Sequence, residues 1–182
     1  MGKFPVISVS LKSVESDTFD GAKEKMCSVI GDEASRFLFL AQSDRLSETD
    51  RLQYKKLVEL DDKGMFAMPD GLLENSLLML SRFLQKHYGQ KTVILIDEYD
   101  VPLDKAYQSG YYDAMVAFIR GLFGQALKTN NSLYFAVLTG CLRISRESIF
   151  TGFNNFNVYT VSDVPYNGLR GQGFAGILWA YG

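Results

Sequence analysis

The stretch TVILIDEYDVPLD, residues 92–104, decides the fold of this chain. Its first five residues are apolar or β-branched, and they run directly into Asp97 and Glu98. An apolar run of this length predicts a buried strand of a parallel sheet, which delivers two carboxylates at its C-terminal end. Open α/β sheets bind their ligands at that end of the strands. The pattern therefore predicts an α/β fold with acidic side chains at the rim of its sheet.

A strand that ends in Asp-Glu has two interpretations. One is a Walker B strand, in which Asp97 organises a hydrated magnesium ion on a nucleotide and Glu98 orients the water that attacks the γ-phosphate. The other is a buried strand followed by an acidic turn, because the motif is short. Asp100 and Asp104 make the acidic cluster denser than a strand end requires. On these residues alone both interpretations stand.

Length and composition narrow the classes of function. A chain of 182 residues with 47% hydrophobic content predicts one domain with a substantial core. The formal charge of −2 provides no basic field, so nucleic acid is not implied as a partner. Cys27, Cys141 and His87 lie far apart in the sequence, which argues against a zinc site and favours a reduced compartment. With no apolar run of membrane-span length and no signal peptide, we expect a cytoplasmic protein and no membrane partner.

Apolar periodicity outlines the other elements. Strands are expected at residues 4–11 and 132–138, with a weaker one at 158–162. Helices are expected at 18–41 with Asp17 as N-cap and a break at Gly31, at 44–60, at 70–88 between Asp70 and Gly89 as caps, at 110–128, and at 145–150. Strands that alternate with helices predict right-handed crossovers and a parallel sheet. Residues 165–182 are glycine-rich and follow no regular period.

Thr139 is a further candidate for the site of Asp97 and Glu98. Because the ends of parallel strands meet at one rim, Asp97, Glu98 and Thr139 are expected to lie close together. Thr139 would then match sensor 1 of an NTPase, a residue that contacts the γ-phosphate or its attacking water; the alternative is an ordinary strand end. Arg143 and Arg146 follow shortly and are candidate anion ligands, although we favour a solvated helix start for Arg146.

Three blocks carry a resemblance to a known family: IDEYDVPL at 96–103, GYY at 110–112 and AVLTGCLRISRESIFTGFNN at 136–155. Over residues 4–162 the chain resembles the bacterial AAA-ATPase-like family, whose members resemble AAA and STAND NTPases and often carry a C-terminal PD-(D/E)XK nuclease-like domain. The resemblance implies a three-layer α/β/α P-loop core with a mostly parallel sheet, and ATP and Mg²⁺ as cofactors. It implies that Asp97 and Glu98 form Walker B, that Thr139 is sensor 1 and that Arg143 lies on the phosphate side.

The chain departs from the family in three respects. The family's Walker A loop lies upstream of the strand that residues 4–11 match, and this sequence contains no G-x-x-x-x-G-K-[ST]. A Met-Gly pair commonly precedes that strand in the family, so we expect Met1 to be an internal methionine and the domain to be truncated at its N-terminus. Residues 1–162 then form an incomplete P-loop domain. Residues 163–182 are a tail outside the family pattern, and the nuclease-like part is missing.

These observations support three hypotheses for function. The first is a fragment of an AAA-like ATPase that carries Walker B and sensor 1 but cannot bind or hydrolyse ATP alone. The second is a non-catalytic protein-interaction module. The third is phosphodiester cleavage by a divalent metal on Asp97, Glu98 and Asp100, against which the missing nuclease lysine argues.

Two structural expectations complete the sequence analysis, the first from the resemblance and the second from the apolar pattern. In this class the strand that leads into Walker A lies beside the sensor 1 strand, so its loss should leave an unpaired edge there. Either residues 165–182 or 158–162 cover that edge, or two copies pair across it as a homo-oligomer. We also expect six residues to be buried between the sheet and its helices: Ile94, Leu95, Ile119, Phe123, Val137 and Leu138.

Overall fold

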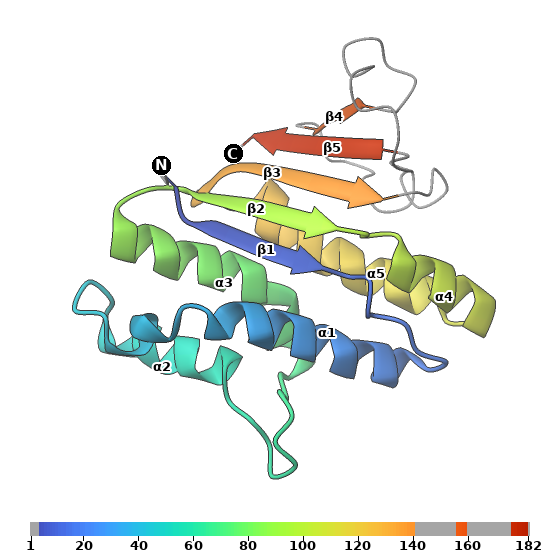
Figure 1. The fold of residues 1–182 in the computed structure, drawn as a ribbon, viewed down its shortest axis with the longest axis horizontal. Coiled ribbons are helices and arrows are strands. Elements are labelled where there is room, and N and C mark those ends of the chain that lie inside the picture. The colour runs from blue at the N-terminus through green and yellow to red at the C-terminus, as the bar shows by residue number, and fades with distance from the viewer. Residues whose placement is uncertain (1–3, 141–155, 160–175, 182) are drawn as a thin grey trace.

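The computed structural model describes residues 4–140, 156–159 and 176–181 and shows a five-stranded sheet in the order β1-β2-β3-β5-β4 (Figure 1). Its strands are β1 (Val6–Ser10), β2 (Thr92–Asp97), β3 (Leu133–Gly140), β4 (Phe156–Tyr159) and β5 (Gly176–Tyr181). β1, β2 and β3 are parallel, whereas β5 is antiparallel to β3 and β4 is antiparallel to β5. The predicted α/β fold with a parallel core is confirmed.

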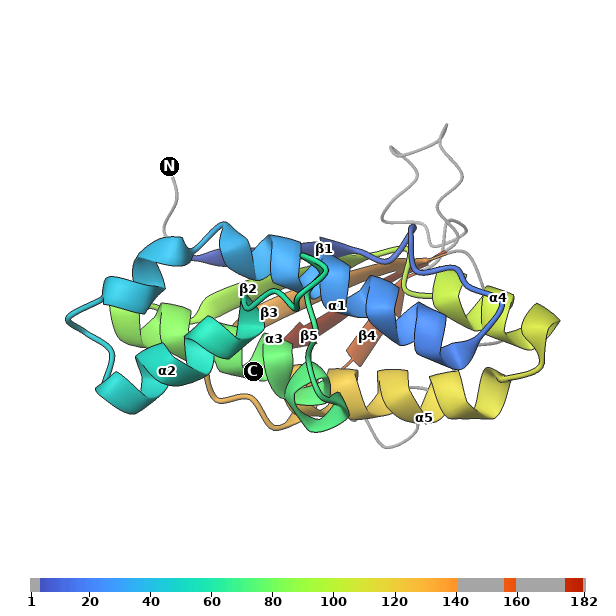
Figure 2. The ribbon, with the colours of Figure 1, turned by 90° about the horizontal axis from the view of Figure 1, so that it is seen from below.

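The helices lie on one face of this sheet (Figures 1 and 2). They are α1 (Phe19–Ser35), the 3-10 helix η1 (Leu38–Gln42), α2 (Glu48–Leu57), α3 (Asp70–Tyr88), α4 (Val101–Ser109), α5 (Tyr112–Phe123) and the π-helical turn η2 (Gly124–Lys128). The crossovers from β1 to β2 and from β2 to β3 step across the sheet in the same direction, so right-handed connections place both sets of helices on the same side. The second helical layer that the resemblance implies is not among the described residues.

The core lies between the sheet and these helices. In β1 the side chains of Ile7 and Val9 are buried. Those of Val6, Ser8 and Ser10 are exposed, because successive residues of a strand point to opposite faces. Four of the six expected core residues are confirmed as buried: Ile94, Ile119, Phe123 and Leu138. The expectation was wrong for Leu95 and Val137, which are only half-buried and lie on the other face of the sheet.

The first long helix differs from the sequence prediction at two points. Its N-cap is Thr18, whose hydroxyl accepts a hydrogen bond from the Gly21 N–H at 3.2 Å. Asp17, the expected cap, pairs instead with the Lys105 ammonium at 2.7 Å. The helix also continues through Gly31 without a break. A Cβ on Gly31 would lie 2.3 Å from the ring of Phe66, so this glycine is needed for close packing.

α3 begins at Asp70 itself, so its N-cap lies one residue before the expected one. Pro69 is its N-cap, and Asp70 makes no capping hydrogen bond but pairs with Lys23 of α1 at 3.1 Å. The C-terminal cap is confirmed, since Gly89 has a left-handed backbone with φ of 69°. α4 was not predicted, although Pro102 in its first turn and Gly110 after its end are ordinary start and stop signals. The expected helix at residues 145–150 lies outside the described residues.

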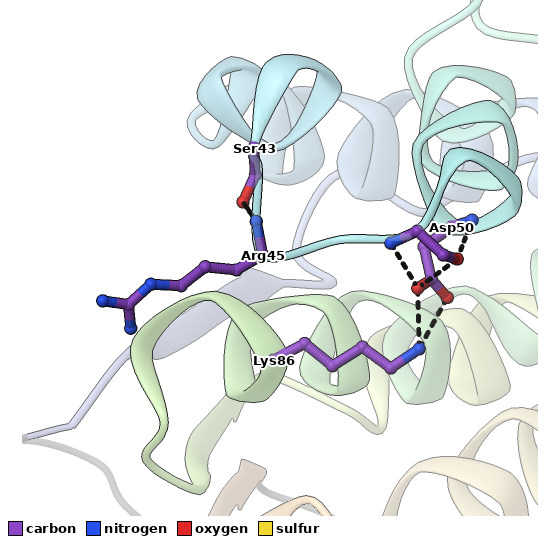
Figure 3. Close-up of polar contacts among 5 residues, drawn as sticks. Ser43, Arg45, Asp50 and Lys86 are labelled. Atoms are coloured by element: carbon purple, nitrogen blue, oxygen red, sulfur yellow. Dashed lines mark hydrogen bonds and ion pairs between the residues drawn. The ribbon is translucent and has the colours of Figure 1, made fainter.

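α2 is fixed to α3 by an ion pair (Figure 3). Asp50 and Ser47 form a reciprocal capping box at the start of α2, and Lys86 of α3 reaches the Asp50 carboxylate at 2.7 Å. Just before α2, the Ser43 hydroxyl accepts the backbone N–H of Arg45 at 3.3 Å. The apolar stripe of α2 is narrow, as its sequence indicates, and it packs against the outside of the helical layer.

β5 lies along the edge of β3, with Val137 opposite Trp179 in the register. Of the three alternatives expected for this edge, the structure shows the first, in which part of residues 165–182 covers it. β4 overlaps the weak strand expected at residues 158–162 and pairs with β5 rather than with β3. In the described part of the chain, no helix has the length and apolar character needed to cross a membrane.

Candidate functional site

The C-terminal ends of β1, β2 and β3 lie side by side at one rim of the sheet (Figure 1). The register places Ser10 opposite Asp97 and Ile96 opposite Leu138, so Thr139 follows directly at the level of Asp97. All the expected site residues of these strands are thus delivered to one place by the parallel pairing.

Asp97 and Thr139 are in contact at this rim. The Thr139 hydroxyl donates a hydrogen bond to Oδ1 of Asp97. Asp97 is exposed and Thr139 is half-buried, so the carboxylate keeps its access to solvent. The predicted proximity of these two side chains is confirmed. The oxygen of Asp97 that accepts this hydrogen bond is Oδ1.

Glu98 has an unusual backbone and an unusual side chain. It is the only described non-glycine residue with a positive φ, at 54°, a conformation that costs free energy for any residue with a Cβ. One of its carboxylate oxygens, Oε2, is buried and has no hydrogen-bond partner among the described residues. Backbone strain and unsatisfied polar atoms are concentrated at functional sites, where the surrounding structure maintains them.

The turn that carries Glu98 is held on both sides. The Asp97 carbonyl accepts the Leu11 N–H at 2.9 Å, and the Tyr99 N–H donates to the Thr139 carbonyl at 3.1 Å. These bonds extend the β1–β2 and β2–β3 pairing past the ends of the strands. Glu98 therefore lies between two residues whose backbones are fixed by neighbouring strands.

Sequence reasoning missed Tyr99 and Gly140. Tyr99 is buried, and its ring lies where a side chain on Gly140 would be: a Cβ there would come within 2.8 Å of the ring and 2.6 Å of Oδ1 of Asp100. Any larger residue would push the acidic turn away from β3. The sequence signal for this close approach is the glycine directly after Thr139.

The acidic cluster does not converge on one point. Asp100 is buried beside Gly140, whereas Asp104 is exposed on α4 and accepts a hydrogen bond from Gln108 at 2.8 Å. Across the described ranges, no group of three His, Cys, Asp or Glu side chains is arranged to hold a metal ion. The geometry thus gives no support to a cage of Asp97, Glu98 and Asp100 built from protein ligands alone.

No described lysine or arginine forms a salt bridge with Asp97 or Glu98. Arg143 and Arg146, the candidate anion ligands, lie outside the described residues. A cavity of about 670 Å³ lies elsewhere, between α1 and the loop before α3, where Lys23, Cys27 and Asp70 line it. None of the rim residues contributes to that cavity.

Comparison with known proteins gives one family and one relative. The model of the family AAA-ATPase-like, described as predicted AAA-ATPase, matches residues 1–150. An uncharacterized protein in the vnfD 5′ region of Azotobacter chroococcum mcd 1 is 32% identical over 84 residues, which are 46% of this chain and 16% of that protein. The chain therefore matches only a small part of this relative's length. No solved structure matches the chain. Because the family model covers most of its length and the rim has the strand-end acids described above, the chain belongs to the AAA-ATPase-like family of predicted AAA-ATPases.

Proposed function

We propose that this rim is the Walker B and sensor 1 half of an ATP-hydrolysing site, and that the 182-residue chain does not bind or hydrolyse ATP by itself. The observation that carries the proposal is the hydrogen bond between Thr139 and Asp97 on adjacent strand ends, next to a strained Glu98 with an unpartnered oxygen. In this arrangement Asp97 would hold a cation, and Glu98 beside it would position a water molecule.

The residues present fit a hydrated magnesium ion on the acidic side. Asp97 would hold the ion through its water shell, and Mg²⁺ would supply charge compensation for phosphate oxygens. Glu98 would orient the attacking water through its unpartnered oxygen Oε2 and would accept a proton from that water. Thr139 would fix the rotamer of Asp97 and present its hydroxyl at the phosphate side. Arg143 is the candidate cation for the phosphates.

The residues present do not fit the triphosphate itself. Backbone N–H groups and the lysine of a Walker A loop provide most of the affinity for the β- and γ-phosphates. The sequence has no such motif, and β5 lies along the edge of β3 where the strand leading into that loop would pair. Two carboxylates that face an anionic ligand without this loop repel it. Binding by this chain is therefore expected to be negligible.

A second candidate function is a non-catalytic interaction module. It is favoured by an exposed apolar cluster at the end of α3, where Phe39 and Tyr88 are 40% and 48% exposed with ring centroids 6.0 Å apart. Leu38 beside them is 59% exposed. Such a surface suits a protein partner or a second copy of the chain, whereas the net charge of −2 does not favour nucleic acid. A cytoplasmic location is part of either proposal.

A thermal-shift titration with Mg-ATP tests the first proposal. A ligand at 100 times its Kd would stabilise the chain by about 2.7 kcal/mol, a readily measured shift. We expect no shift and no hydrolysis from the 182-residue chain. A saturable shift that Asp97→Ala removes would contradict the proposal that the 182-residue chain does not bind ATP by itself. Arg143 would then be the first residue to substitute.

The assignment of the rim to an ATP-hydrolysing site is tested on a chain extended upstream to include a Gly-Lys-Thr loop. This protein should bind ATP, and Glu98→Gln should keep binding while it abolishes turnover. Glu59→Gln, on an exposed carboxylate after α2, is the matched control and should retain turnover. An extended chain that carries the loop but does not bind ATP would contradict the ATPase assignment, as would a fully active Glu98→Gln variant.

A further inference from the structure

Among the described strands, β1 is the outermost on its side of the sheet, and β2 is its one partner there. The Val93 N–H donates to the Pro5 carbonyl and the Leu11 N–H donates to the Asp97 carbonyl, so the odd-numbered residues of this segment face β2. In a parallel ladder the residues between them direct their N–H and C=O groups the other way. The backbone groups of Val6, Ser8 and Ser10 therefore point outward. An outer strand of this kind is a template for the addition of another strand.

One of these outward groups is already occupied by a side chain of α1. The Ser8 N–H donates to Oε1 of Glu33 at 2.7 Å, across 25 residues of sequence. Arg36, one turn further along the helix, donates to both oxygens of the same carboxylate at 2.8 and 2.7 Å. α1 runs back alongside β1, which brings its last turns to the outer strand (Figure 1).

A buried glutamate at position 33 costs free energy that an apolar side chain in the same place would not. Glu33 is only 6% exposed, whereas its partner Arg36 keeps 56% of its side chain exposed. Burial of a carboxylate is unfavourable unless it is paired and hydrogen-bonded, and an apolar side chain of the same length would fill the space without that cost. The specific contribution of the carboxylate is its hydrogen bond to an outward backbone N–H. Inward-pointing charged side chains at an edge are a known means of preventing strand addition.

We propose that Glu33 closes the β1 edge, and that this edge is a strand-pairing surface for a second copy of the chain once the carboxylate is removed. Two β1 strands can pair antiparallel about a two-fold axis, because the same outward groups then face each other. A free N–H at Ser8, at the centre of β1, would complete the row that such pairing needs. This inference concerns the edge alone and does not depend on ATP chemistry.

Sedimentation equilibrium of three variants of the 182-residue chain tests the proposal. Glu33→Met has a side chain of similar length that can pack against apolar neighbours, so the variant should fold. Its thioether does not hold the Ser8 N–H and can turn away from it, so the variant should self-associate with a higher average mass than the parent chain at the same concentration. Glu33→Gln retains an amide oxygen that accepts the Ser8 N–H, so it should keep the parent mass. Asp32→Ala, at an exposed position on the same helix, should also keep it.

A fourth variant identifies the surface that pairs. Ser8→Pro removes the outward N–H without breaking the ladder to β2, because that group does not bond β2, and proline is tolerated on edge strands. In the Glu33→Met background it should restore the parent mass. The proposal is overturned if Glu33→Met has the parent mass, if Glu33→Gln associates to the same extent as Glu33→Met, or if the association persists in the double variant.

Discussion

The Thr139 hydroxyl donates a hydrogen bond to the Asp97 carboxylate, although the two residues are 42 positions apart in the sequence. The contact exists because β2 and β3 are parallel neighbours with Ile96 opposite Leu138. It orients one carboxylate oxygen toward β3 and leaves the other at the rim. The rim is therefore organised before any ligand is present, which reduces the reorganisation that a ligand would require.

This bond predicts a measurable energetic coupling. Thr139→Val keeps the shape of the side chain but loses the donor, and it should destabilise the chain by about 0.5–1.5 kcal/mol in urea unfolding. In an Asp97→Ala background the same substitution should cost nothing, because the acceptor is absent. Equal costs in both backgrounds would show that the two side chains do not interact in solution.

The left-handed backbone of Glu98 predicts that glycine is more stable at this position. Glu98→Gly should raise the free energy of unfolding by about 1 kcal/mol, because glycine adopts a positive φ without the Cβ clash and the buried unpartnered oxygen is removed. Asp113→Gly, in the first turn of α5, is the control and should lower stability by about 1 kcal/mol. If both variants lose stability alike, Glu98 is not strained.

Adjacent residues of β2 should respond differently to truncation. Ile94 is fully buried against the helices, so Ile94→Ala should cost about 2–5 kcal/mol. Leu95 lies on the other face and is only half-buried, so Leu95→Ala should cost clearly less. Chemical denaturation of the two variants checks this order. The reverse order would mean that β2 presents its other face to the helices.

Asp50 predicts a pH dependence of stability. Burial raises the pKa of Asp50, but hydrogen bonds from Lys86 and Ser47 outweigh it and hold the pKa below its ordinary value of 3.8. A carboxylate with a lowered pKa in the folded state stabilises the fold above the unfolded-state pKa, and this contribution is lost as the pH falls through the folded value. The parent chain should therefore exceed Asp50→Asn in stability near neutral pH, by about 0.5–1 kcal/mol.

The difference between the parent and Asp50→Asn should shrink as the pH falls below 3.8. High salt should reduce it at neutral pH, since Lys86 is half-exposed. Asp44→Asn, on an exposed carboxylate before α2, is the control and should show no such trend. A difference that stays constant across the pH range would show that the ion pair does not contribute to stability.

Much of the fold follows from local sequence pattern. The apolar runs before Asp97 and Thr139 indicate buried strands, and their separation by a strongly periodic helix requires a parallel arrangement. Parallel pairing by itself then brings Asp97 and Thr139 to one rim. The glycine at position 89 likewise marks the end of α3 without reference to any distant contact. These features depend on properties of neighbouring residues, which the sequence states directly.

Features that depend on distant contacts could be found only in the tertiary structure. Ile94 and Leu95 are equally apolar, and only the position of the helices on one face of the sheet decides which of them is buried. The strain at Glu98 arises because β1 and β3 fix the residues on either side of it. The Ser8 N–H bond to Glu33 likewise depends on how α1 folds back along β1. The sequence by itself determined the three parallel strands, most of the helices and which strand ends meet. The tertiary structure decided which face is buried, where the backbone is strained and how the edges are closed, because these depend on contacts between residues far apart in the chain.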